Sequence, residues 1–429
     1  MTGVSYKRVF SLIAVCSAAT AGLHRAHAGS PLDPFINGAF HGKFRTYYIN
    51  REFNKIGGEP ERRIQESLAA GGWLGYETAA WSGLSLGAVI YTSQGVLVNN
   101  PNFGGGGILG PDNESYSSLG QAYLQYLLKN TTLRLYRQGI NSPFINDYDT
   151  KMTPRTWEAY TLYNRDIPDV TLTTSFIRQI KGWYETDFQY MGEFANNNGT
   201  YQVTKTNIPV SLAGAVWTPA DNYKFQLWDY FAYEYFNGAY LQGNASWPLT
   251  DDGLSLGLAL QGWTQRSAGE EVGGDFSTCF GGGEIDLGWK CWTISLIYTV
   301  TDRGSRVVNP WGNSFSFASI FEEDFDYAGE EAFVVGLEYD FSETLLDGLT
   351  ASVYVCNGDT PASGPGATPS QKEYDFFIKY RPDPDLEGLH LKIEGAVVDT
   401  EQSFPEGEDY HDIRFIFNYD FGFGIKPKT

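Results

Sequence analysis

The chain has 429 residues, of which 42% are hydrophobic and 16% aromatic, and its formal net charge is −21 at pH 7. An acidic surface of this kind argues against nucleic acid as a partner. No apolar run of about 18 residues follows residue 28, which excludes a transmembrane helix there. The mean hydropathy of −0.30 fits a soluble protein and a membrane β-barrel equally well, because lipid-facing and lumen-facing residues alternate in a barrel.

The first 28 residues have the features of a Sec signal peptide. Lys7 and Arg8 form a basic start, an uncharged apolar run covers 9–22, and Ala26-His27-Ala28 is a cleavage site with small residues at both ends. The run is too short for a membrane anchor, which is the alternative interpretation. We therefore expect residues 1–28 to be removed on export and residues 29–429 to form one domain.

Short turn sequences and long polar segments alternate along the mature chain. Eight short turns are predicted at 81–83, 129–130, 166–169, 219–222, 250–253, 288–290, 343–348 and 382–385. Nine long connections are predicted at 50–63, 95–117, 139–155, 179–207, 233–238, 265–282, 301–331, 357–372 and 399–410. Seventeen connections join eighteen strands. The pattern predicts an all-β fold, a transmembrane antiparallel β-barrel of about 18 strands with short periplasmic turns and long extracellular loops.

Apolar and polar side chains alternate within the predicted strands. Near the C-terminus one face has Ile413, Phe415, Phe417, Tyr419 and Phe421, and the other has Asp412, Arg414, Asn418 and Asp420, broken only by Ile416. In a transmembrane barrel the apolar face meets lipid and the charged face meets a wet lumen. Tryptophans near predicted strand ends suit the two aromatic girdles of such a barrel: Trp73, Trp81, Trp157, Trp183, Trp217, Trp228, Trp247, Trp263 and Trp292.

Cysteine and histidine usage gives no sign of a metal or cofactor site. Three cysteines follow the leader, and Cys279 with Cys291 is the candidate disulfide pair across one hairpin. Only five histidines are present, and two of them lie in the leader. The glycine run Gly104–Gly107 lacks the Lys-Ser/Thr that a phosphate loop requires. We therefore expect no cofactor and no metal.

Charged residues fall into an acidic and a basic set. The acidic run Glu322–Asp326, with Glu330 and Glu331, suits a cation-attracting vestibule or one wall of a pore constriction, or simply a solvated loop. The basic set lies on predicted inward faces: Lys43, Arg45, Arg134, Lys379, Arg381, Lys392 and Arg414. It would form a track for anionic groups, or pair with Glu373, Asp375, Glu394 and Asp412 on the same faces. The residues alone leave both arrangements open.

Several stretches, in order and at compatible spacing, resemble the OprD family of substrate-specific outer-membrane porins. They are Tyr47–Arg51, Asn146–Trp157, Ser319–Glu330, Gly348–Asp359, Lys372–Asp375, Leu386–Leu389 and Asp412–Tyr419. The stretch Asn146–Trp157 resembles the constriction-loop segment of the family. The resemblance covers most of residues 38–421. The chain departs from the family where Lys151 replaces the preferred arginine, where Glu373-Tyr374-Asp375 replaces an arginine-rich strand, and where Glu394 adds a carboxylate.

The resemblance implies a monomeric barrel of eighteen strands in the outer membrane of a Gram-negative bacterium. Inward loops would narrow its pore, and small, often carboxylate-bearing solutes would pass along a basic ladder. Mapped onto this chain, the ladder includes Lys43 or Arg45, Arg51, Lys151, Arg155, Lys392 and Arg414, which face Asp324, Asp326 and Glu330. Arg134 joins the candidate set from its inward face. The implied partners are small hydrophilic solutes, outer-membrane lipid and lipopolysaccharide, and the barrel-assembly machinery.

The favoured function is therefore passive diffusion of small hydrophilic solutes, such as amino acids or small organic acids, and not catalysis. A plugged outer-membrane barrel that acts as a surface adhesin or structural protein is the alternative. An exported soluble β-rich enzyme such as a glycosidase is a third option. It would need a catalytic carboxylate pair, and the sequence gives no cue for that spacing.

Overall fold

The computed structural model describes residues 30–56, 59–97, 106–197, 201–312, 315–344, 346–361, 370–382, 386–400 and 408–424. The predicted leader and parts of the predicted loops at 95–117, 357–372 and 399–410 lie outside the described residues. No helix in the described part is long and apolar enough to cross a membrane.

Within these residues the chain forms helices α1 (Asp33–Ile36) and α2 (Met191–Asn197), a 3-10 turn (Pro111–Asn113) and nineteen strands. The strands are β1 (Ala39–Ile56), β2 (Glu59–Glu77), β3 (Leu84–Leu97), β4 (Tyr116–Leu128), β5 (Thr131–Gln138), β6 (Thr156–Asn164), β7 (Val170–Lys181), β8 (Gln189–Tyr190), β9 (Val210–Ala220), β10 (Tyr223–Ala232), β11 (Phe236–Pro248), β12 (Leu254–Ser267), β13 (Ser277–Trp289), β14 (Trp292–Thr301), β15 (Glu331–Asp340), β16 (Leu349–Asp359), β17 (Gln371–Tyr380), β18 (Leu389–Thr400) and β19 (Asp409–Gly424).

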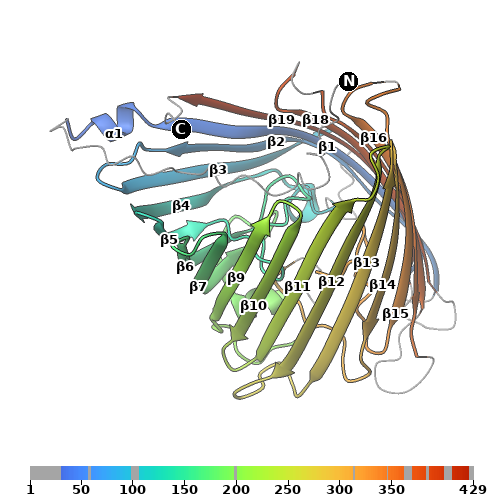
Figure 1. Ribbon diagram of the computed structural model, residues 1–429. Coiled ribbons are helices and arrows are strands. Elements are labelled where there is room, and N and C mark those ends of the chain that lie inside the picture. Colours follow the sequence, from blue (N-terminus) through green and yellow to red (C-terminus); the bar gives the residue numbers. More distant parts are fainter. Residues whose placement is uncertain are drawn as a thin grey trace.

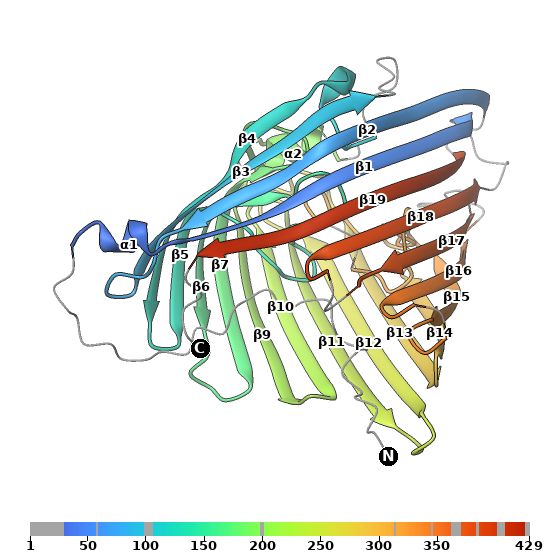
Figure 2. The same cartoon turned by 90° about the horizontal axis from the view of Figure 1, so that it is seen from above.

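The strands close into a barrel. Apart from β8, each strand pairs antiparallel with its neighbour in the chain, and β19 pairs with β1 from Ala39 opposite Gly424 to Lys55 opposite Asp409 (Figures 1 and 2). The two-residue β8 bonds only to β7, and β7 continues the wall with β9. The wall therefore has eighteen strands, which confirms the predicted fold class.

Most of the predicted turns and loops agree with the connections between strands in the structure. The turn between β4 and β5 is Lys129-Asn130, and the connection between β5 and β6 is 139–155, as the sequence predicts. Two predicted long connections are wrong. Segment 50–63 is mostly strand, because β1 and β2 stay paired up to Ile56 opposite Glu59. Segment 233–238 is a tight connection, because β10 and β11 remain paired up to Ala232 opposite Phe236.

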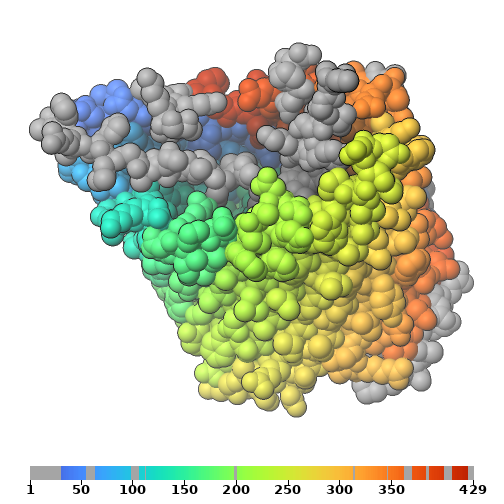
Figure 3. Space-filling model, in the orientation of Figure 1, coloured from blue at the N-terminus to red at the C-terminus, as the bar shows by residue number. Residues whose placement is uncertain are grey.

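Many large apolar side chains are exposed on the outer face of the wall, such as Leu241, Leu260 and Val353. Figure 3 shows this face as a continuous surface over the green to orange strands. On β1, Phe44 is 45% exposed on the outside, whereas Arg45 is 4% exposed on the inside. Exposed aromatic residues cluster at the end of the barrel that has the short turns, here called the turn end. They are Trp81, Tyr126, Trp217, Trp289, Trp292 and Tyr419, and they form the aromatic girdle expected of a membrane barrel.

Not every tryptophan belongs to this girdle. Trp183 lies in the lumen, where its indole N–H donates to the Tyr148 carbonyl at 2.9 Å, so its assignment to the girdles was wrong. Trp157, Trp228 and Trp263 are buried inside the barrel, so their assignment to the girdles was wrong as well. They belong to a large apolar cluster that joins strands β6, β7 and β9 to β13 to helix α2 and to the inward connections at 139–155 and 302–330. Phe144 stacks on Trp263 with ring centroids 4.6 Å apart, and Trp311 stacks on Phe236 at 5.7 Å. This aromatic cluster fills one side of the lumen.

A second, smaller cluster explains the break in the pattern of β19. Ile416 points inward among charged residues and packs with Tyr47, Ile49 and Met152 beneath the 139–155 connection. Its hydrophobic contact is therefore with a loop in the lumen, and not with lipid.

The proposed pairing of Cys279 with Cys291 is wrong. The two residues lie at opposite ends of β13, and about ten residues of strand at about 3.3 Å each separate them by roughly 33 Å. A disulfide requires Cα atoms within about 7 Å. All three cysteines in the described part are free.

Replacing Trp263 with alanine should lower the free energy of unfolding by about 3–5 kcal/mol, because it removes a buried ring from the aromatic cluster. The measurement is denaturant unfolding of the folded protein in detergent, followed by circular dichroism. Trp217→Ala, on the outer face, is the control and should lower the free energy of unfolding clearly less than Trp263→Ala. Equal losses for the two variants would contradict the cluster's role.

Candidate functional site

Two long connections turn inward and meet inside the barrel. The first, 139–155, places Phe144, Ile145 and Met152 in buried positions. The second, 302–330, places Trp311 and Phe325 in buried positions. Their charged residues face the inner sides of β1, β17, β18 and β19, which is the side that the aromatic cluster leaves free.

The first group of charges ties the 139–155 connection to β1. Asp149 accepts from the Lys43 ammonium at 2.6 Å and from the Arg45 guanidinium at 2.8 Å. Arg45 also donates to Asn418 at 2.6 Å and to the backbone carbonyl of Lys151. Both basic residues are therefore compensated by one carboxylate of the loop.

The second group joins β1 and β19 to the 302–330 connection. The Nε atoms of Arg51 and Arg414 lie 2.8 Å and 2.9 Å from opposite oxygens of Asp412. Both guanidinium groups also pair with the Glu322 carboxylate. Two arginines and two carboxylates thus form a locally neutral network.

Glu373 on β17 fixes the backbone next to this network. Its carboxylate accepts from the backbone N–H groups of Glu322 at 2.7 Å and of Glu323 at 2.9 Å. The Tyr410 hydroxyl donates to the Glu323 carboxylate at 2.7 Å. These bonds hold the acidic run against the wall.

Lys151 and Arg155 flank the ring of Trp183. The Arg155 guanidinium carbon lies 4.1 Å from the ring centroid, and the Lys151 nitrogen lies 5.8 Å from it. Arg155 donates to the carbonyls of Trp311 at 3.0 Å and Gly312 at 2.8 Å, and so links the two inward connections. Within the described ranges, neither cation has a carboxylate oxygen within 4.0 Å.

Burial disfavours the charged form of both groups and so lowers both pKa values. It lowers the pKa of Arg155 to about 10. Burial, together with the charges of Arg414 and Arg51, holds the pKa of Lys151 well below its usual value.

The three predicted acidic residues lie in different surroundings. Asp324 lines a cavity of about 390 Å³ with Tyr201, Arg306, Asn309, Glu322, Glu323 and Tyr327. Asp326 lies 3.4 Å from Arg306. Glu330 is buried and accepts from the backbone N–H of Tyr327 at 2.9 Å, so it shapes its own loop. Burial raises the pKa of Glu323 and Asp326 to about 7 and that of Glu330 to about 8.

Two predicted basic residues lie apart from the inward connections. Arg134 donates to Gln125 at 3.0 Å close to the β4–β5 turn. Lys392 pairs with Glu394 at 3.2 Å, near the start of β18 at the turn end. The other predicted cations, Lys43, Arg45, Arg51, Lys151, Arg155 and Arg414, gather around the two inward connections.

The prediction of the site missed four residues: Asp149, Glu322, Glu373 and Trp183. Glu322 was noted only as part of an acidic run, and Glu373 only as a possible ion-pair partner. The signal for Asp149 was its position in the predicted constriction loop, two residues before Lys151.

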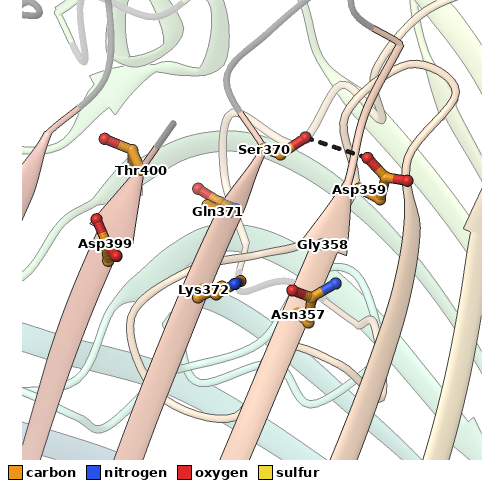
Figure 4. Close-up of a pocket in the computed structure, with 8 residues that line it drawn as sticks. All are labelled: Asn357, Gly358, Asp359, Ser370, Gln371, Lys372, Asp399 and Thr400. Carbon is orange, nitrogen blue, oxygen red and sulfur yellow. Dashed lines mark hydrogen bonds between the residues drawn. The ribbon is translucent and has the colours of Figure 1, made fainter. Parts of the chain in front are cut away.

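A second cavity of about 380 Å³ lies at the loop ends of β16, β17 and β18 (Figure 4). Its polar lining comprises Asn357, Gly358, Asp359, Ser370, Gln371, Lys372, Asp399 and Thr400, and Ser370 bonds to Asp359 at 3.3 Å. None of the predicted site residues lines it. The described residues include no group of three or more His, Cys, Asp or Glu side chains that could hold a metal ion.

Replacing Glu373 with glutamine should loosen the acidic run, because charge-assisted bonds to two backbone N–H groups are worth about 1.5–3 kcal/mol each. The expected result is faster hydrogen exchange at the amides of Glu322 and Glu323, read by mass spectrometry of a peptide covering 315–330. Glu331→Gln, at an exposed site, is the control and should leave the exchange unchanged. Unchanged protection in Glu373→Gln would refute the anchoring role.

Comparison with solved structures identifies the same architecture in other outer-membrane proteins. Acinetobacter baumannii OccAB3 superposes with a TM-score of 0.80 at 15% identity, covering 90% of this chain and 100% of that one. Pseudomonas aeruginosa OccK9 (OpdG) superposes with a TM-score of 0.78 at 20% identity, covering 91% of this chain and 100% of that one. Pseudomonas aeruginosa OpdK, solved with vanillate, gives 0.77 at 17% identity, covering 90% and 99%.

A search of curated proteins finds no match to the sequence. The model of the family described as outer membrane porin, OprD family, matches residues 33–423, which is most of the chain. Both this family and the barrel fold are those of channels and not of enzymes. The chain therefore belongs to the OprD family of outer membrane porins, which mediate diffusion of small hydrophilic solutes across the outer membrane of Gram-negative bacteria.

Proposed function

We propose that this porin prefers small hydrophilic solutes that bear a carboxylate, and that Lys151 and Arg155 select them. The observation that supports this proposal is the difference in pairing among the cations at the inward connections. Lys43, Arg45, Arg51 and Arg414 are each compensated by a carboxylate. Lys151 and Arg155 have no such partner among the described residues and are the cations available to a solute.

The bonding of Arg155 supports this role. Its guanidinium uses one nitrogen for two backbone carbonyls, and its buried Nε has no hydrogen-bond partner. A carboxylate oxygen is the acceptor that a guanidinium N–H binds most strongly. OpdK, solved with the aromatic carboxylate vanillate, has the same fold, and we expect a carboxylate to suit this chain as well.

The neighbouring acidic cavity extends the proposal to amino acids. Glu323 and Asp324 line it, and the charge of Asp324 acts on Arg155. A solute with both an ammonium and a carboxylate group would find a charge of opposite sign for each. Small organic acids would use only the cationic side.

We further infer the cellular setting of the protein. The leader 1–28 is removed on export, the turn end faces the periplasm, and the long loops face the outside of the cell. The barrel works as a monomer in a membrane of lipid and lipopolysaccharide, after insertion by the barrel-assembly machinery.

The direct test is single-channel conductance of the purified protein in a planar bilayer under a salt gradient. Discrete open steps, with a conductance reduced by a millimolar amino acid or small organic acid but not by an uncharged sugar, are expected. Open steps that no carboxylate affects would contradict the proposed preference. No steps from a barrel shown to be folded would indicate that its lumen is plugged.

Replacing Lys151 with glutamine should shift the reversal potential towards cation selectivity, because it removes a cation without a counter-ion. Arg155→Gln should do the same. Glu322→Gln is a control in which a negative charge is removed instead of a positive one. Because this variant leaves Arg51 and Arg414 with Asp412 as their only carboxylate partner, it should shift selectivity towards anions. A reversal potential unchanged by Lys151→Gln and Arg155→Gln would remove both residues from the constriction.

Raising the pH from about 5.5 to 8.5 should also increase cation selectivity. Glu323, Asp326 and Glu330, with pKa values of about 7, 7 and 8, lose protons over this range and add negative charge. The lowered pKa of Lys151 acts in the same direction, because a neutral amine repels cations less than an ammonium group does. The double variant Glu323→Gln/Asp326→Asn should flatten the response. A shift towards anions at higher pH would contradict the assignment.

A further inference from the structure

The N-terminal helix α1 carries apolar side chains that the barrel does not cover. Leu32, Phe35 and Ile36 are 63%, 53% and 75% exposed. No residue of α1 is buried, and Asp33 is its only charged residue. In water such a group of apolar side chains would be unfavourable, because each leaves most of its apolar area hydrated.

Hydrogen bonds fix α1 to the outside of the barrel. The Tyr76 hydroxyl on β2 donates to the backbone carbonyl of Phe35. Tyr76 is on the lipid-facing side of β2, because its ring packs at 4.7 Å against Phe40, which is 47% exposed on the outer face of β1. The backbone N–H of Ala79 donates to the Pro34 carbonyl at 2.9 Å. The helix therefore lies beside the outer wall and not under the pore (Figure 2).

The position of α1 along the barrel coincides with the aromatic girdle. The β2–β3 connection that bonds Pro34 also contains Trp81, which is 64% exposed. Phe423, the partner of Phe40 in the β1–β19 register, is 67% exposed. The exposed face of α1 thus continues the lipid-contacting surface of β1, β2 and β19 at the turn end.

We propose that α1 is an interfacial membrane anchor whose apolar face lies in the phospholipid headgroup and acyl boundary at the turn end. Apolar and aromatic side chains with a nearby polar backbone suit this boundary, where one side of a segment meets acyl chains and the other meets water. The continuity with the girdle identifies lipid as the occupant rather than another protein. This inference requires only that the barrel spans a membrane and does not depend on the transported solute.

Site-directed spin labelling in phosphatidylethanolamine/phosphatidylglycerol vesicles tests the anchor. Cys279 and Cys291 are replaced by serine, and buried Cys356 remains. A nitroxide at Ile36→Cys should be more accessible to oxygen than to a nickel chelate, as for Leu241→Cys on the lipid face. Asp251→Cys, in an exposed turn, should show the opposite preference. If Ile36→Cys matched Asp251→Cys, or were shielded from both reagents by protein, the proposal would be overturned.

A second variant separates membrane contact from folding. In Phe35→Ser/Ile36→Ser, a label at Leu32→Cys should become markedly more accessible to the nickel chelate than the same label in the parent helix, because the variant removes the two apolar side chains that the labelled parent keeps. Single-channel conductance should be unchanged, since α1 lies outside the lumen. A label at Leu32→Cys that is nickel-accessible already in the parent helix would also overturn the proposal.

Discussion

Closure of the sheet by β1 and β19 is the constraint on which the rest of the molecule depends. In a lipid environment an unpaired backbone N–H or C=O costs several kcal/mol, and a closed antiparallel wall leaves no edge. Closure also divides the side chains of every strand into two environments. Because those facing inward share an enclosed space, residues separated by hundreds of positions, such as Arg51 and Glu322, become neighbours.

The enclosed space explains why most of its charges are paired. Removing an isolated charge from bulk water is costly, and a partner with additional hydrogen bonds offsets the cost. Asp149 serves two cations of β1, and Glu322 serves an arginine from each of β1 and β19. In both cases the carboxylate belongs to an inward connection, so the ion pairs also fasten the loops that narrow the lumen. Paired charges contribute little net field, so the selectivity that we propose rests on Lys151 and Arg155.

The aromatic cluster fastens the inward connections on the side of the barrel where there are few ion pairs. It packs the inward connections against β6, β7 and β9 to β13, and leaves the charged residues of β1, β17 and β19 on the opposite side. One side of the barrel interior is therefore filled by buried apolar side chains, and the other holds the charged network. Arg155, which bonds to the carbonyls of Trp311 and Gly312, lies where these two sides meet.

The parts of this architecture that repeat locally could be predicted from the sequence. Alternation with a period of two and turn residues such as Lys129-Asn130 placed most of the strands and gave their number. The run at 50–63 was mistaken for a loop because it is rich in polar residues and lacks a regular apolar alternation, although its backbone stays paired up to Ile56 opposite Glu59. Asp149 and Glu322 were missed as partners because ion pairs across 104 and 271 residues leave no periodic trace.

The unequal lengths of the strands have a consequence for the surrounding bilayer. β1 and β2 have 18 and 19 residues, whereas β5 and β6, on either side of the inward 139–155 connection, have only 8 and 9. An eight-residue strand is about 27 Å long and, tilted by about 40°, spans roughly 20 Å of membrane, less than the apolar band of about 25 Å typical of such barrels. The loop that narrows the lumen thus shortens the wall behind it. Hydrophobic mismatch should thin the lipid beside β5 and β6, so that the barrel sits in an asymmetric annulus of lipid.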